Sequence, residues 1–150
     1  MDKAFQRMGS ESNSQVGRDF ELVAKKFFQS QGLSLNKDYA IPLGVHNRKK
    51  EHKFDLGNLS PKTIVECKSH RWTSGNNIPS AKITVWNEAM YYFHLAPDEY
   101  RKIMFVLRDF SVKRDETLAQ FYLRTRLHLV PDRVEFWEFD ELKQTASRLR

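Results

Sequence analysis

A stretch of seven residues, Thr63-Ile-Val-Glu-Cys-Lys-Ser69, constrains the fold most, because its β-branched residues predict a strand that carries an acid and a base. Successive side chains of a strand point to opposite faces, so Glu66 and Lys68 share one face and Cys67 lies on the other. Charged side chains on an apolar strand are rarely buried unless they are paired or bind a metal. The strand therefore predicts either a salt pair at a sheet edge or a charged functional site.

The composition places this strand in a basic, globular chain. A length of 150 residues predicts one domain over residues 1–150, and 40% hydrophobic residues are enough for a core. A formal charge of +6 and a pI near 9.5 favour a polyanionic partner such as a nucleic acid. No apolar run reaches the length of a membrane span and the N-terminus lacks the core of a signal peptide, so we expect no membrane partner.

The number of cysteines limits the cellular compartment that suits the protein and the classes of metal site that it can form. The chain has one cysteine, Cys67, which excludes an internal disulfide framework and fits a reducing cytoplasm. A four-cysteine zinc site is excluded for the same reason, and the five histidines lack the spacing of a zinc motif. The sequence therefore predicts a cytoplasmic protein without a zinc motif.

Helical and extended patterns alternate along the chain. We expect the polar segment 1–14 to be a flexible arm. A predicted helix then runs from a capping box at 12–15 to Gly32, and predicted strands follow over 38–45, 54–58 and 63–69. The second half of the chain is predicted to contain a helix from 79 to about 95, a strand over 101–108, a helix capped by Asp115 or Thr117 that stops before Pro131, a strand over 134–139, and a helix from Asp140 to the C-terminus. Pro42 marks the first strand as an irregular or edge strand, and residues 46–53 are expected to form a basic loop. The order α-β-β-β-α-β-α-β-α predicts an α/β domain with a central mixed β-sheet flanked by helices.

Two further acids lie where these elements can bring them to Glu66. Asp55 is on the strand that forms an antiparallel hairpin with 63–69, so we expect it opposite the region from Glu66 to Lys68. Glu21 lies at the edge of the apolar stripe of the first helix, although a surface carboxylate near a helix N-terminus would look the same. Two carboxylates from neighbouring strands suit Mg²⁺, and a lysine beside them can position or deprotonate an attacking water. The set indicates phosphodiester hydrolysis.

The pattern Glu-x-Lys occurs three times, at 51–53, 66–68 and 141–143, so its context must separate the copies. The first lies in a charged loop, and the third lies in the predicted terminal helix, where a two-residue spacing puts the side chains on different faces. The middle copy alone lies on an apolar strand that follows an acid-bearing strand and an acid-bearing helix. We therefore expect only this copy to be functional.

Asp55, ten intervening residues and Glu66-Cys-Lys68 resemble the motif of the PD-(D/E)xK nucleases, the restriction-endonuclease-like superfamily. Phe54 stands where that family often has proline, and the helix with Gly17-Arg-Asp-Phe-Glu21 is similar to the first helix of many members. The resemblance covers about residues 15–95. It implies a restriction-endonuclease-like core, dependence on Mg²⁺ with Mn²⁺ as a substitute, and cleavage of DNA by in-line attack of a metal-activated water.

The same resemblance implies a role for each site residue. Asp55 and Glu66 would bind the metal together with the backbone carbonyl of Cys67, whose side chain faces the core. Lys68 would act on the attacking water. Glu21 would act through water or a second metal.

From these residues we expect a Mg²⁺-dependent DNA endonuclease of the restriction, homing or repair type, acting on duplex or branched DNA. One site per chain and two strands per duplex suggest a homodimer or a higher homo-oligomer. We expect the DNA contacts from the loops beside the site, at Arg48, Lys49, Lys50, Lys53, His70 and Arg71. The alternatives are a non-catalytic nucleic-acid-binding module that keeps the nuclease fold and, ranked below it, an RNA-directed nuclease.

Overall fold

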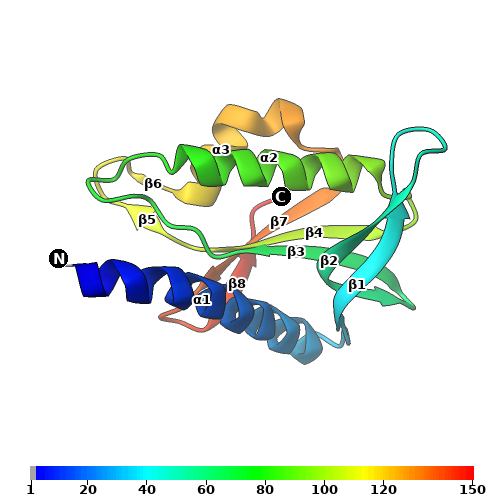
Figure 1. The fold of residues 1–150 in the computed structure, drawn as a ribbon, viewed down its shortest axis with the longest axis horizontal. Coiled ribbons are helices and arrows are strands. Elements are labelled where there is room, and N and C mark those ends of the chain that lie inside the picture. Colours follow the sequence, from blue (N-terminus) through cyan, green and yellow to red (C-terminus); the bar gives the residue numbers. More distant parts are fainter. Residues whose placement is uncertain (1–2) are drawn as a thin grey trace.

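A mixed six-stranded β-sheet forms the centre of the structure (Figure 1). The computed structural model describes the backbone of residues 3–150 and the side chains of residues 15–150. Along the sheet the strands follow the order β1 (Asn36–Leu43), β2 (Lys50–Leu59), β3 (Lys62–Lys68), β4 (Arg101–Leu107), β7 (Val134–Asp140) and β8 (Thr145–Arg148). β3, β4 and β7 are parallel, and the other neighbours are antiparallel. The predicted α/β class with a central mixed sheet is confirmed.

Helices cover both faces of this sheet. One face carries α2 (Ser80–Leu95) and α3 (Leu118–Arg126), which continues into the 3₁₀ helix η1 (Leu127–Leu129), and the other face carries α1 (Lys3–Ser30), as Figure 1 shows. Each face has its own buried cluster, with Trp86 under α2 and Phe28 under α1. β3 contributes Ile64 to one cluster and Val65 to the other, as a strand buried on both faces must. Among the described residues, no helix is both long and apolar enough to cross a membrane.

The first helix starts earlier than its sequence pattern indicates. Its backbone is helical from Lys3, where we expected a flexible arm over 1–14; residues 1 and 2 lie outside the described part of the chain. Segment 3–14 contains Gly9 and three serines, which disfavour a helix, but it has no proline and its other residues include good helix formers such as alanine, glutamine, arginine and methionine. The predicted end is confirmed: Gly32 has a φ of +84°, and Leu33 N–H donates to the Phe28 carbonyl across the terminus.

The predicted basic loop 46–53 is only partly a loop. β2 begins at Lys50, which pairs with Leu43 of β1, and Lys53 pairs with Ala40. The charged residues fit a strand because β1 and β2 form an outer hairpin with solvent on one side, where polar side chains can alternate with apolar ones. Pro42 lies in β1 at the edge of the sheet, as predicted, because an edge strand tolerates a missing N–H donor.

Two further differences lie after β4. A short ribbon of β5 (Phe110–Ser111) and β6 (Glu116–Thr117) precedes α3 and was not predicted. Thr117 caps α3 as expected, in a capping box with Gln120, but the α-helix ends at Arg126 and the last turn is η1.

The predicted C-terminal helix is wrong, because this segment forms strand β8. Asp140 does not cap a helix: its Oδ1 accepts hydrogen bonds from the N–H groups of Leu142 and Lys143, at 3.0 and 3.1 Å, within a turn. Gln144 then adopts a φ of +55°, and Thr145 pairs back onto Asp140. The free edge of β7 offers unpaired backbone groups, and pairing them outweighs the helical preference of a short polar segment.

Candidate active site

The candidate site lies where β2 and β3 separate. Their paired residues run from Leu59 with Lys62 to Leu56 with Val65. Just beyond this last pair, Oδ2 of Asp55 accepts a hydrogen bond from the backbone N–H of Cys67 at 2.8 Å. The carboxyl group of Asp55 therefore bridges the two strands at the point where their ladder ends, and the predicted placement of Asp55 beside the Glu66 to Lys68 region is confirmed.

The Glu21 carboxyl group meets Asp55 from α1, so it is not an isolated surface acid. A hydrogen bond from Asp55 stabilises the Glu21 carboxylate, although burial raises the pKa of Glu21 above its ordinary value. Burial, and then the charge of Glu66, raise the pKa of Asp55 to about 8, against the opposing effect of the Cys67 N–H. At neutral pH, Asp55 therefore holds a proton. Three acids are crowded into one place, at an electrostatic cost that a bound cation would relieve.

Glu66 and Lys68 lie side by side on β3, as the strand alternation predicts. Glu66 is buried, with 6% of its surface exposed, and its Oε2 is 3.5 Å from Nζ of Lys68. A salt pair at a sheet edge was the alternative interpretation. The two side chains do form a salt pair, but it is not the exposed pair of that interpretation, because Glu66 is buried.

His52 is a further member of the site that sequence reasoning missed. Its Nε2 lies 3.6 Å from Oε1 of Glu66, whereas Lys68 is near Oε2, and its ring stacks on Tyr92 of α2 with centroids 3.7 Å apart and planes at 14°. The edge of the same ring packs against Phe54. Within the described residues, His52 Nε2 is buried and makes no hydrogen bond. The sequence does contain a signal for an inward-facing histidine. His52 lies two residues before the apolar Phe54, and residues two apart on a strand share one face.

A cleft of about 660 Å³ opens over Glu21 and Asp55, between α1 and the segment from the end of β3 to the start of α2, and Glu66 is not among the residues that line it. The predicted site residues on its wall are Glu21, Asp55, Cys67, Lys68, His70 and Arg71, and Lys82 of α2 joins them. The remaining predicted DNA-contact residues, Arg48, Lys49, Lys50 and Lys53, belong to the β1–β2 hairpin and are exposed. The structure thus divides the predicted nucleic-acid contacts into a group inside the cleft and a group on the hairpin.

Cys67 contributes to this site through its backbone. Its side chain belongs to the buried cluster under α1, as predicted, and burial raises the pKa of the thiol well above its ordinary value. The thiol therefore stays protonated and unreactive. Its N–H holds Asp55 in place.

The donor set fits a hard divalent cation in type. Mg²⁺ prefers carboxylate oxygens, and Glu21, Asp55 and Glu66 supply them. In the part of the chain with described side chains, no three His, Cys, Asp or Glu side chains already converge as a ligand group. Glu66 instead faces Lys68 and His52. The fit therefore rests on the crowded acids and the raised pKa of Asp55.

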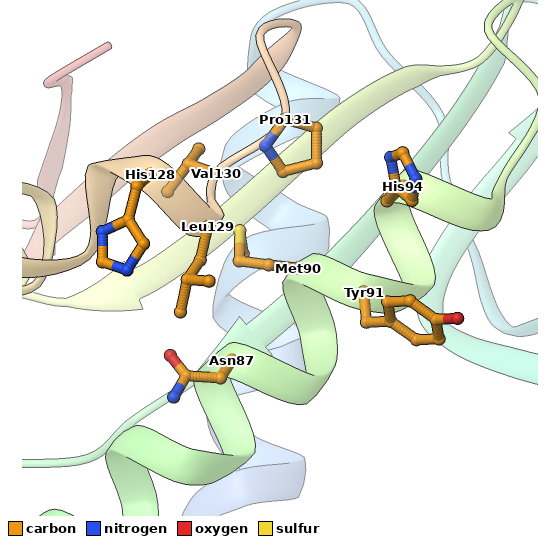
Figure 2. A pocket seen from close by; sticks show the side chains of 8 residues that line it. All are labelled: Asn87, Met90, Tyr91, His94, His128, Leu129, Val130 and Pro131. Carbon is orange, nitrogen blue, oxygen red and sulfur yellow. The ribbon is translucent and has the colours of Figure 1, made fainter.

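A second hollow lies between α2 and the segment after α3 (Figure 2). It has a volume of about 360 Å³, and His94 and His128 lie on its wall. None of the eight residues that line it is an acid, so it lacks the carboxylates that would hold Mg²⁺ for a metal-dependent hydrolysis. The cleft over Asp55 is the better candidate active site.

Comparisons of this chain with protein-family models, with curated proteins and with solved structures find no match. A functional assignment must therefore come from the residues of the cleft.

Proposed function

We propose that this chain is a Mg²⁺-dependent DNA endonuclease with a restriction-endonuclease-like core. One observation carries the proposal: Glu21, Asp55, Glu66 and Lys68, from a helix and two strands, meet where β2 separates from β3. A stable fold gains little from burying such a set, because desolvating charges costs several kcal/mol. Groups with perturbed pKa values in a cleft are typical of catalytic sites.

The cation would occupy the position that the crowded acids create. Asp55 and Glu66 would hold it together with the carbonyl of Cys67, and Glu21 would act through water or a second ion. When bound, Mg²⁺ supplies positive charge beside the phosphate and makes coordinated water more acidic. The raised pKa of Asp55 implies that a proton leaves this carboxyl group when a cation binds.

Lys68 would position the attacking water. Its ammonium group, with 17% of the side chain exposed, lies 3.5 Å from Glu66 and lines the cleft, so it reaches both the metal ligands and solvent. A lysine held between a carboxylate and a cleft can orient water by hydrogen bonding or take part in its deprotonation. Water would then attack the phosphorus in line with the leaving oxygen.

The proposed substrate is duplex or branched DNA in the cytoplasm. The net charge of +6 and the basic residues of the β1–β2 hairpin favour a polyanionic substrate. Cutting both strands of a duplex with one cleft per chain favours a homodimer. The single thiol is buried and protonated, which suits a reducing compartment.

Cleavage assays test the proposal. Wild type should produce nicked or cut DNA with Mg²⁺ or Mn²⁺ and none with EDTA, and Lys68→Ala should lose about 10²- to 10⁴-fold in rate. Lys143→Ala is a matched control, because it removes the lysine of another Glu-x-Lys pattern, in an exposed turn. Equal rates for Lys68→Ala and Lys143→Ala would remove Lys68 from the mechanism, and DNA that stays intact under wild type with both metals would overturn the proposal.

A non-catalytic nucleic-acid-binding module is the second candidate. Glu66 already lies 3.5 Å from the ammonium group of Lys68, so its charge is partly balanced without a cation. Such a module would bind DNA in a salt-sensitive manner and yield no product with either metal. The same assays separate the two candidates.

A further inference from the structure

His70 makes a hydrogen bond that fixes which of its ring nitrogens carries the proton. Nε1 of Trp86 lies 2.8 Å from Nδ1 of His70. An indole N–H is only a donor, so Nδ1 must accept through its lone pair. A neutral imidazole has one N–H group, which must then be on Nε2. Trp86 is fully buried in α2, so the ring is held by the core of the protein.

The surroundings of His70 oppose a second proton. Burial, and then the positive charges of Lys68 on β3 and Lys82 on α2, lower the pKa of His70 to about 4. The acids that line the same cleft, Glu21 on α1 and Asp55 on β2, do not reverse this shift. A histidine with a lowered pKa is neutral above that pKa, so His70 stays uncharged at physiological pH.

The N–H on Nε2 has no protein partner in residues 15–150, whose side chains are described. His70 lines the cleft that also contains Asp55 and Lys68. The ring therefore brings a rigidly held, uncharged donor to the cleft, next to two lysines. Phosphodiester oxygens accept hydrogen bonds from such donors, and a neutral donor adds direction where the lysines already supply charge.

We propose that His70 and Lys82 form a phosphate-binding subsite, in which Nε2–H of His70 donates to a non-bridging oxygen of a phosphodiester bound in the cleft. This inference rests on the proposed function for its ligand, a nucleic acid. His70 then recognises phosphate through one neutral hydrogen bond, and the strength of that bond does not change with pH across the neutral range.

A purely structural role, in which His70 only satisfies the buried Trp86 indole, makes different predictions for two variants. In His70→Asn the amide oxygen can replace Nδ1 as the acceptor for Trp86, but the donor at Nε2 is lost. In His70→Gln the amide nitrogen can replace Nε2 as a donor, while the contact with Trp86 weakens. A purely structural role requires His70→Asn to behave like wild type. Phosphate binding instead requires His70→Gln to behave like wild type.

The first measurement reads the tautomer directly in the unmodified protein. Nitrogen-15 NMR of the histidine rings, with His70→Asn used to assign the His70 signals, should show Nε2 protonated and Nδ1 unprotonated from about pH 5 to 8. A proton on Nδ1, or a titration with an ordinary histidine pKa in this range, overturns the inference. This result is independent of any enzymatic activity.

The second measurement is the affinity for a short single-stranded DNA oligonucleotide in Ca²⁺, with the oligonucleotide checked for cleavage afterwards. His70→Asn should bind about 10- to 100-fold more weakly than wild type, the loss expected for one hydrogen bond to a charged group. His70→Gln should bind within a few-fold of wild type, and Lys82→Ala should be weaker. Unchanged binding by His70→Asn overturns the subsite.

The two proposals can fail separately. If wild type cleaves DNA and His70→Asn binds and cleaves as well as wild type, the subsite is wrong and the nuclease stands. If neither wild type nor any variant cleaves DNA but His70→Asn binds more weakly than His70→Gln, the nuclease is wrong and the subsite stands.

Discussion

The same Glu-x-Lys pattern occurs on β3 and in the turn between β7 and β8, and the two copies lie in opposite environments. The side chain of Glu66 is 8% exposed, and it contacts Lys68 of its own pattern and His52 of the neighbouring strand. The side chain of Glu141 is 47% exposed, and its partner is Arg71, from outside the pattern, at 2.8 Å. The residue pattern is identical, but only the buried copy brings its acid and base together.

The comparison shows what burial adds to a pair of charges. An exposed ion pair contributes about 0 to 1 kcal/mol, because water already solvates both partners. A buried carboxylate must be compensated by its neighbours, and any change in those neighbours alters its charge state or orientation. Glu66 is therefore sensitive to its surroundings, and Glu141 is not.

Replacing Glu66 and Glu141 in separate variants should give the largest difference between the two copies of the pattern. Glu66→Gln keeps the shape of the side chain but removes the proposed ligand charge, and the rate of DNA cleavage should fall by more than about 100-fold. Even the mutation of a residue that only orients a metal ligand lowers metal affinity or activity by about 10- to 100-fold. The rate should be measured under single-turnover conditions with Mg²⁺. Glu141→Gln, the same change in the exposed copy, should keep the wild-type rate. Similar losses in both variants would contradict the contrast.

Removing the neighbour of the buried acid should give the next largest effect. In His52→Ala, Glu66 loses the ring that packs between it and Tyr92, and the Glu66 carboxylate gains freedom to leave its position. We expect about a 10- to 100-fold loss of cleavage rate, partly recovered at high Mg²⁺, because a misplaced ligand weakens metal affinity. His46→Ala changes an exposed histidine of the adjacent loop and is the control. A His52→Ala rate equal to that of the control would show that Glu66 does not need this contact.

The crowding of acids around Glu66 should also appear in stability. An unfolded aspartate has a pKa of about 3.9, and Asp55 has a pKa of about 8 when folded. Between these values the folded protein binds more protons, so its free energy of unfolding without metal should fall as the pH rises from about 4 to 8, by several kcal/mol from this group, since each unit of pKa difference corresponds to about 1.4 kcal/mol. In Asp55→Asn this fall should be smaller, since an amide stays neutral and can still accept the Cys67 N–H.

Urea unfolding at several pH values measures this effect. Glu141→Gln is again the control and should keep the wild-type slope with pH. Added Mg²⁺ should stabilise wild type most at high pH, because cation binding releases the proton from Asp55. Identical slopes for wild type and Asp55→Asn would mean that Asp55 is ionised in the folded protein at neutral pH.

The sequence predicted the parts of the fold that apolar periodicity determines. α2 runs over Ser80–Leu95 as expected, with Ile83, Trp86, Met90 and Phe93 buried, and the continuous apolar run of β4 is covered on both faces. The C-terminal strand was missed because β8 is a polar segment whose structure is set by a distant partner, the edge of β7. A local pattern cannot report an edge that exists only after the sheet has formed.

The same distinction applies to the site. Glu21, Asp55 and Lys68 were predicted to lie together because the order of helix and hairpin brings them to one place. The contact of His52 with Glu66 could not be predicted, because it depends on where β2 leaves β3 and on Tyr92 from α2. The tautomer of His70 likewise depends on Trp86, 16 residues away in the chain.

The smallest expected effect concerns the exposed copy alone. Glu141→Ala removes the pair with Arg71, whose side chain is 50% exposed, so the free energy of unfolding should fall by less than about 1 kcal/mol. Arg71 lines the cleft and keeps its 3.9 Å contact with Asp109, but its charge is no longer neutralised by Glu141. DNA affinity should therefore rise slightly at low salt, and the gain should vanish at high salt, because screening removes an exposed charge effect. Fluorescence anisotropy across a salt series measures this, with Arg71→Ala expected to change affinity in the opposite direction. A large loss of stability or of cleavage in Glu141→Ala would show that the exposed copy is not the passive one, and that burial alone does not separate the two patterns.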